Sequence, residues 1–253
     1  MKRLGILGGM SWESTAHLYK LLNQDVAARL GGLHSADLLI RSVDFAEIEV
    51  LQRAGYWTAA AQLLGHAGRG LKAAGAQGLL IATNTMHKLA DEVEQISGLP
   101  LIHIVDATAA ALKAAGVRRA GLLATRYTME QDFYMGRMRE RHGIELLTPP
   151  LTGRDEVHRI IYEELCRGRI FDSSRLFYQA AVRELAGQGA EAVILGCTEI
   201  CLLLDPADAT SPVPLFDGTA LHARAAVYWM LGGTTADSDG ARRRNDFIDR
   251  QQA

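Results

Sequence analysis

The sequence contains few aromatic residues, few cysteines and no long apolar segment, and each shortage excludes a class of protein. Aromatic residues make up only 6% of the 253 residues, and the three cysteines form no pairing pattern of the kind that holds secreted folds together. No stretch approaches the ~18 consecutive apolar residues that would suggest a membrane span. The first residues also lack the apolar core and cleavage site of a secretory signal. We therefore expect a cytoplasmic protein with free thiols and no membrane partner.

Charge of one sign is not in excess either. The chain carries 27 Lys and Arg against 29 Asp and Glu, which gives a formal net charge of −2. Such a balance provides no overall field to attract nucleic acid, so no nucleic-acid partner is expected. The one basic run, 242–244, lies in the polar segment 232–253, which we predict to be a disordered tail.

Apolar residues, by contrast, make up 48% of the chain, which is enough for a substantial core. Short aliphatic runs typical of buried strands alternate with longer segments of helical periodicity. The predicted strands cover 2–8, 37–42, 78–82, 100–105, 120–125, 144–148, 192–196 and 213–216. The predicted helices cover 14–30, 58–74, 85–96, 106–115, 127–142, 154–167, 173–187 and 218–231. This alternation predicts an α/β fold with mostly parallel sheets flanked by helices.

The two halves of the chain resemble each other at three strand ends, which occur in the same order. The matched segments are 5–9 with 121–125, 78–85 with 192–199, and 105–109 with 216–220. A repeat of this length indicates duplicated domains, although any α/β pattern of apolar strands followed by Asp, Thr or Gly gives part of this similarity. We predict two pseudo-symmetric domains: 1–105 plus 211–231, and 106–210. In this arrangement the final strand crosses back to complete the first sheet.

Thr83 and Cys197 occupy matching positions in this repeat, each at the end of an aliphatic strand. Open α/β sheets bind ligands at the carboxyl ends of their strands, so we expect a site in the cleft between the domains. The start of the next helix would lower the pKa of the Cys197 thiol and favour a thiolate. The alternative is that Cys197 is a small buried apolar residue. Two proton-handling groups on either side of one carbon could invert it.

The residues that follow these two positions are candidates for holding a substrate carboxylate. Asn84, Thr85 and Thr198 could supply N–H groups and side chains to stabilise charge that accumulates there as an α-proton leaves. The simpler alternative is that they cap helices, as Asn and Thr commonly do. Glu199 could polarise Cys197, or could simply favour the helix N-terminus.

Patterns for the common cofactors are missing. The turn at Gly8 and Gly9 lacks the spacing of a dinucleotide site, and the chain has no loop for nucleoside triphosphates. Lys88 could suggest a Schiff base with pyridoxal phosphate, but no phosphate-binding glycine loop accompanies it. No cluster of His, Cys and Asp has the spacing of a zinc site. We therefore expect neither a cofactor nor a metal.

Three motifs, at 7–15, 83–88 and 196–200, together resemble the cofactor-independent aspartate/glutamate racemases, and the similarity runs over residues 1–231. The resemblance implies two pseudo-symmetric α/β domains with the site between them. It also implies that one residue removes the α-proton of a small amino-acid substrate while another returns a proton to the opposite face. Members of that family are usually homodimers.

Thr83 departs from the common family pattern, in which a cysteine stands at this position. The sequence here is similar to the L-aspartate/glutamate-specific branch, also described as broad-specificity amino-acid racemases. This resemblance implies that Cys197 handles the proton on the L face and Thr83 on the D face. The positions that it places around the substrate are Met10, Gln52, Thr83, Asn84, Thr85, Cys197, Thr198 and Glu199.

A second departure concerns specificity. Aspartate racemases often have a lysine in the segment 162–168, and Cys166 stands in its place here. A preference for a dicarboxylate side chain therefore does not follow from the resemblance alone. We expect a cofactor-independent racemase of L-aspartate, L-glutamate or a related amino acid. The alternatives are a single-cysteine decarboxylase of malonate-type substrates on the same scaffold, and a catalytically weak amino-acid-binding protein.

Overall fold

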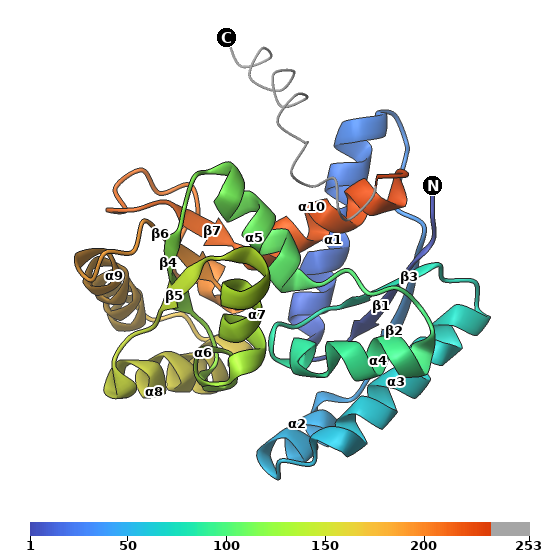
Figure 1. Cartoon of the computed structure of the whole chain (residues 1–253), viewed down its shortest axis with the longest axis horizontal. Coiled ribbons are helices and arrows are strands. Elements are labelled where there is room, and N and C mark those ends of the chain that lie inside the picture. Colours follow the sequence, from blue (N-terminus) through green and yellow to red (C-terminus); the bar gives the residue numbers. More distant parts are fainter. Residues whose placement is uncertain (234–253) are drawn as a thin grey trace.

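The computed structural model describes residues 1–233, in which parallel strands alternate with helices (Figure 1). The predicted tail lies outside this range from residue 234 on. The strands are β1 (Leu4–Gly8), β2 (Leu38–Ser42), β3 (Gly78–Ile81), β4 (Arg119–Leu123), β5 (Glu145–Leu147), β6 (Ala192–Leu195) and β7 (Leu215–Asp217). The α-helices are α1 (Trp12–Leu30), α2 (Phe45–Arg53), α3 (Trp57–Ala73), α4 (Ala90–Ser97), α5 (Ile104–Ala114), α6 (Arg126–Glu130), α7 (Asp132–His142), α8 (Leu151–Arg159), α9 (Asp172–Gly187) and α10 (Gly218–Met230). Four short helical segments of other kinds are η1 (Thr85–Leu89), η2 (Ile160–Glu164), η3 (Leu165–Arg167) and η4 (Thr198–Leu202).

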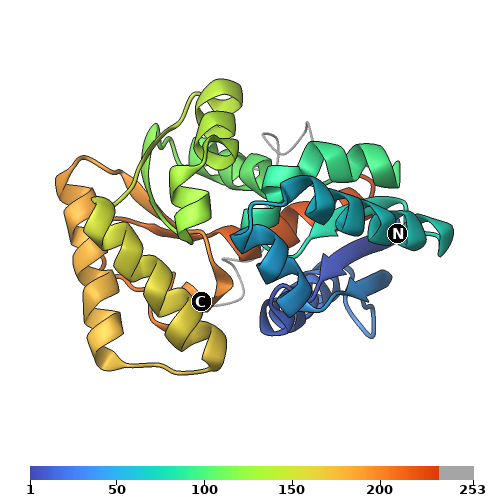
Figure 2. The ribbon, with the colours of Figure 1, turned by 90° about the horizontal axis from the view of Figure 1, so that it is seen from below.

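Two separate parallel sheets organise the chain, one in each half (Figures 1 and 2). The first has the order β2-β1-β3, and the second has the order β5-β4-β6-β7. Every strand pair is parallel, as connections through helices require. The predicted fold class, two α/β domains with parallel sheets flanked by helices, is confirmed.

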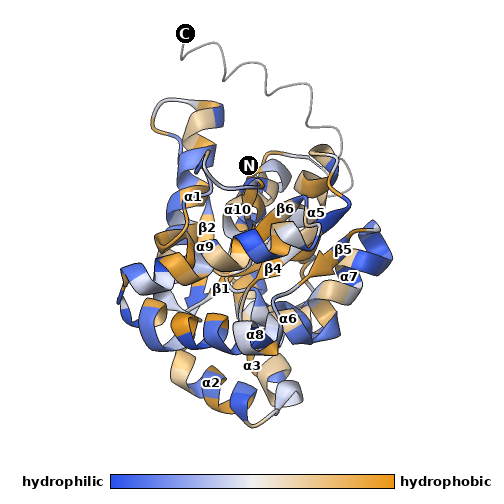
Figure 3. Ribbon diagram, turned by 90° about the vertical axis from the view of Figure 1, so that its left-hand side faces the viewer, coloured by the Kyte–Doolittle hydropathy of each residue, from blue (hydrophilic) through white to orange (hydrophobic). Residues whose placement is uncertain are grey.

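The strands are apolar on both faces because helices cover both faces of each sheet. In β1, Ile6 packs with α1 and α10 on one face, whereas Leu7 packs with α3 on the other. The second sheet lies in one large cluster that runs from Ile104 to Leu204. Figure 3 shows the apolar residues gathered in strands such as β4 and β6, with hydrophilic residues on the outer helices. Within residues 1–233, no helix is both long and apolar enough to cross a membrane.

The last strand joins the second sheet, so the prediction that it completes the first sheet is wrong. Leu215 and Phe216 of β7 pair with Val193 and Ile194 of β6. The helix that follows, α10, does cross back and packs against α1 (Figure 1). β7 pairs with the free edge of β6, whereas the apolar face of α10 is buried against the first sheet. The limits of the two domains, 1–105 plus 211–231 and 106–210, stay a prediction.

The predicted strand over 100–105 is reduced to a single bridge, between Leu79 and Leu101. Helix α5 begins earlier than expected because the side chain of His103 accepts a hydrogen bond from the N–H of Val105 and caps it. The first sheet therefore ends at β3 in place of a full fourth strand.

Two other differences position site residues. Helix α2, which the sequence did not predict, starts where Asp44 accepts a hydrogen bond from the N–H of Ala46. The helix predicted over 154–167 is an α-helix only to Arg159 and continues as a π-helical turn, η2, and a 3₁₀ turn, η3. Both segments carry side chains that line the pocket described below.

Candidate active site

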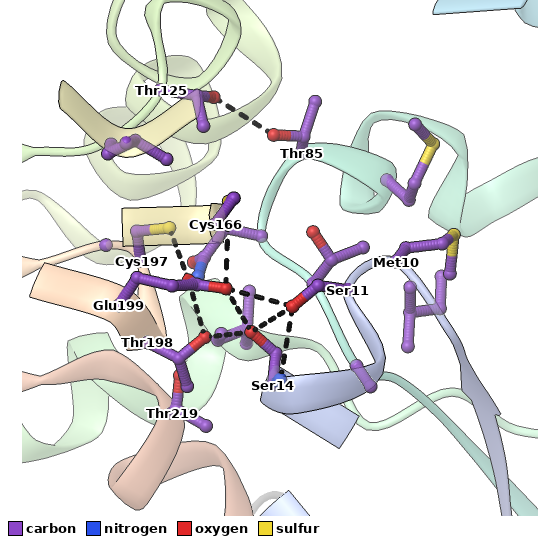
Figure 4. Close-up of a pocket in the computed structure, with 18 of the residues that line it drawn as sticks. Met10, Ser11, Ser14, Thr85, Thr125, Cys166, Cys197, Thr198, Glu199 and Thr219 are labelled. Atoms are coloured by element: carbon purple, nitrogen blue, oxygen red, sulfur yellow. Dashed lines mark hydrogen bonds between the residues drawn. The ribbon is translucent and has the colours of Figure 1, made fainter. Parts of the chain in front are cut away.

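A pocket lies where the strand ends of the two halves meet (Figure 4). It contains about 680 Å³ of space that no atom fills, open solvent at its mouth included. The first half contributes the ends of β1 and β3, and the second half contributes the end of β6 and the turns η2 and η3. All eight residues that the sequence placed around the substrate line it: Met10, Gln52, Thr83, Asn84, Thr85, Cys197, Thr198 and Glu199.

Glu199 occupies the centre of a hydrogen-bond network on the second-half wall of the pocket (Figure 4). Its side chain is buried, with 8% of the residue exposed. The thiol of Cys197 donates to its Oε2 at 2.9 Å, and so does the hydroxyl of Thr198 at 2.9 Å. These contacts arise because β6 ends at Leu195 and the chain turns at once into η4. One carboxylate oxygen thus binds both a thiol and an alcohol.

The other oxygen of Glu199 is bound from the opposite half of the molecule. At the N-terminus of α1, Ser11 donates to Oε1 at 3.0 Å and Ser14 donates to it at 2.8 Å. The hydroxyl of Ser14 also hydrogen-bonds to that of Thr198. Burial by itself raises the pKa of Glu199, but hydrogen bonds from Cys197, Ser14 and Thr198 outweigh it and hold that pKa below its usual value. Glu199 is therefore an ionised carboxylate that links the two halves.

Ser11 and Ser14 were not among the predicted site residues, because in the sequence they mark only the start of a helix. Ser11 does cap α1, since its side chain accepts a hydrogen bond from the N–H of Ser14. Their spacing of three places both hydroxyls on one face of the first turn. This spacing of two serines within the motif 7–15 was the one sign in the sequence that both hydroxyls could donate to the same acceptor.

The prediction that the Cys197 thiol has a lowered pKa is wrong. The residue is only partly exposed to the pocket, and burial of its thiol raises the pKa well above the usual value; the charge of Glu199 raises it further. The segment after Cys197 is a five-residue 3₁₀ helix in place of the expected α-helix, and its dipole does not reverse these effects. The resting state is a neutral thiol that donates its proton to a carboxylate. A thiolate forms when that proton moves to Glu199.

Thr83 lies two residues after the end of β3, on the opposite wall, where its side chain is partly exposed. Its backbone carbonyl accepts a hydrogen bond from Nδ1 of His87 at 2.8 Å, which fixes the turn into η1. Next to it, Oδ1 of Asn84 is buried and has no hydrogen-bond partner in the described part of the chain. The hydroxyl of Thr85 is already paired with that of Thr125 at 3.0 Å (Figure 4). The side chains of Thr83 and Asn84 thus keep polar atoms that can form hydrogen bonds with a substrate.

The remaining predicted residues form the walls of the pocket. Gln52 is 4% exposed on α2, and its Nε2 donates to the hydroxyl of Tyr162 in η2 at 3.3 Å. Burial raises the pKa of Tyr162, which is therefore neutral. Met10 is buried in the turn after β1 and packs in the core of the first half. Cys166 also lines the pocket, with its Sγ 4.0 Å from Oε1 of Glu199.

Three buried histidines lie behind the Thr83 wall. The ring of His87 is 4.8 Å from that of His103 and 5.3 Å from that of His222, measured between centroids. Burial lowers the pKa of all three, to about 3 for His103 and about 4 for His222. His222 lines the pocket and its Nε2 donates to the carbonyl of Ile102 at 2.7 Å. The cluster is neutral near pH 7.

This cluster predicts that acid destabilises the protein before its carboxylates titrate. Because the unfolded histidines bind protons near pH 6.5 and the folded ones do not, stability is full above that pH and falls as pH drops toward about 4. His103 and His222 should each contribute a loss of about 2 kcal/mol in the free energy of unfolding between pH 7.5 and pH 5. Urea denaturation at the two pH values measures it. His222→Gln should flatten the dependence, and an unchanged slope in that variant would contradict this origin.

Two α/β domains that share one pocket at their strand ends define a fold with a ligand site between the two halves. The chain belongs to the Asp/Glu/hydantoin racemase family, whose model matches residues 7–226. Family membership supports a racemase, which is a class of isomerase. Among residues 1–233, no three His, Cys, Asp or Glu side chains are grouped to hold a metal ion.

Two solved structures agree with this family. A structure from Yersinia pestis, described as a candidate Asp/Glu racemase, is 55% identical; it covers 91% of this chain and 100% of its own, with a TM-score of 0.85. An aspartate racemase homologue from Pyrococcus horikoshii is 32% identical with the same coverage and a TM-score of 0.79. An uncharacterized protein from Pectobacterium carotovorum is 30% identical over 151 residues, 60% of this chain and 99% of its own.

Proposed function

We propose that the protein is a cofactor-independent amino-acid racemase that uses Cys197 and Thr83 on opposite faces of the substrate α-carbon. The expected substrate is L-aspartate, L-glutamate or a related α-amino acid. The observation that carries the proposal is that these two residues, which end matching strands in the two halves, line one pocket. A homodimer in the cytoplasm is part of the same proposal, and light scattering during size-exclusion chromatography tests the dimer.

The first half-reaction begins with the proton of Cys197. It moves from Sγ to Oε2 of Glu199, 2.9 Å away, and leaves a thiolate beside a neutral carboxylic acid. The thiolate then takes the α-proton of the L-amino acid and becomes a thiol again. Negative charge accumulates on the substrate α-carboxylate, where the N–H groups at the starts of η1 and η4 can stabilise it.

The second half-reaction takes place on the other face. The hydroxyl of Thr83 donates its proton to the α-carbon and gives the D-amino acid. Thr83 recovers a proton from solvent, and Glu199 releases to solvent the one that it received from Cys197. The number of protons bound to the enzyme is therefore the same before and after one turnover. Because an alcohol is a far weaker acid than a thiol, removal of the α-proton of the D-isomer, which needs a deprotonated Thr83, is slower than removal of the α-proton of the L-isomer by Cys197.

This asymmetry gives the experiment that tests the proposal. In heavy water at neutral pH, we expect the α-hydrogen of an L-substrate to exchange at least about tenfold faster than that of its D-isomer. Proton NMR follows the loss of the α-signal, and chiral chromatography follows the appearance of the second isomer. Faster exchange of the D-isomer would contradict the assignment of faces.

The same samples decide between the proposal and the alternatives raised by the sequence. A decarboxylase would release carbon dioxide from a malonate-type substrate without racemising any amino acid. A binding protein without catalysis would bind an amino acid in calorimetry and show no exchange in heavy water.

A further inference from the structure

The pocket contains one carboxylate and no cationic side chain. Within residues 1–233, Glu199 is the only acidic residue that lines it, and neither lysine nor arginine does. His222, the only histidine on its wall, is neutral because burial lowers its pKa to about 4. Cys166 is also neutral, since burial and the charge of Glu199 raise its pKa to about 12. The pocket therefore carries a net charge of −1.

Two cations on elements that border the pocket, Arg159 and Lys88, already have partners. Arg159 binds Glu156 and Glu164 at 2.7 and 2.8 Å. Lys88 donates to Oε1 of Gln131 at 2.7 Å, and its ammonium lies 4.7 Å from the centre of a tryptophan ring. Neither cation faces the space in which a substrate would lie.

The two groups that every α-amino acid shares find complementary partners in this pocket. An ammonium group is matched by the charge of the Cys197–Glu199 pair, which is −1 whichever of the two holds the proton. The buried Oδ1 of Asn84, which has no partner among the described residues, is a further acceptor for it. The α-carboxylate can accept hydrogen bonds from uncharged donors that line the pocket, such as the amide Nδ2 of Asn84.

A second carboxylate, on the substrate side chain, would have no such partner. Burying a charge without a counterion is unfavourable, and here it would also be repelled by Glu199. Polar groups left to contact a side chain include the uncharged Gln52, Tyr162 and Cys166. Such groups suit an amide or a hydroxyl, which can both donate and accept hydrogen bonds.

We propose that this pocket selects α-amino acids with uncharged polar side chains over the dicarboxylic amino acids, because its single formal charge is negative and already matched to the α-ammonium. The inference rests on the proposed racemase function. It narrows the class of substrate and leaves the roles of Cys197 and Thr83 unchanged.

Pairs of substrates that differ in one charge test the proposal on the unmodified protein. L-Asparagine and L-aspartate have nearly the same shape, as do L-glutamine and L-glutamate. The measured quantity is kcat/KM for α-hydrogen exchange in heavy water. In at least one of the two pairs, we expect this value to be at least about tenfold higher for the amide than for the acid. Equal or faster exchange of the acid would overturn the inference and leave the racemase standing. Exchange with no amino acid would overturn both.

A variant that adds the missing cation provides the second arm. Cys166 is partly exposed and lines the pocket, so Cys166→Lys places an ammonium group there. We expect the ratio of acid to amide kcat/KM to rise at least about tenfold over the unmodified protein. Cys166→Met is the matched control, because it adds similar length without charge and should leave the ratio within about twofold. If the ratio changed equally in both variants, selectivity would depend on the size of the side chain at position 166, and the charge argument would be overturned.

Discussion

Cys197→Ser lowers the rate of α-hydrogen exchange of the L-substrate by about a thousandfold. Serine keeps the position and the hydrogen bond to Glu199, so the network that joins the two halves survives. What changes is acidity, because an alcohol gives up its proton far less readily than a thiol and the carboxylate of Glu199 cannot remove it. The measurement is exchange in heavy water followed by NMR, at saturating substrate, so that the loss is read in kcat.

The matched control for this substitution is Cys201→Ser. Cys201 lies in the same short helix η4, is also partly buried, and does not line the pocket. It should retain exchange within about threefold, since it contacts no reacting group. If both serine variants lost activity equally, the effect would belong to the folding of η4 and the role of Cys197 as base would be contradicted.

Thr83→Cys raises the exchange rate of the D-isomer by about one to two orders of magnitude. The substitution places a thiol at the end of β3, where it mirrors Cys197 at the end of β6. A thiol gives up its proton several orders of magnitude more readily than an alcohol, so the base on the D face becomes stronger. The ratio of L to D exchange measured in heavy water should therefore fall toward one.

Thr83→Val completes this test because valine has nearly the shape of threonine and no hydroxyl. Exchange of the D-isomer should fall below detection, while exchange of the L-isomer, which begins at Cys197, should persist. The backbone carbonyl of residue 83 would still accept the hydrogen bond from His87, so the turn is retained. Persistent D exchange in this variant would rule out Thr83 as the proton donor.

Much of the architecture was predictable because it depends on local pattern. Aliphatic runs bounded by glycine or polar residues marked β1, β3, β4 and β6, and those runs are buried on both faces. Elements with weaker patterns were less predictable. Helix α2 was missed, and the segment over 160–167 was expected to be α-helical but forms a π-helical turn and a 3₁₀ turn. The sheet to which β7 belongs depends on which free edge it meets, and no local pattern records that.

The sequence alone determined which side chains end the strands, since strand ends follow from the positions of apolar runs and turns. It thereby brought Thr83, Cys197 and their neighbours forward as one candidate site. Only the tertiary structure decided their protonation. Ser11 and Ser14 reach Glu199 across more than 180 positions, and the burial of the Cys197 thiol beside that carboxylate raises its pKa. Desolvation and long-range hydrogen bonds depend on what packs around a group, and the linear order of residues does not contain that information.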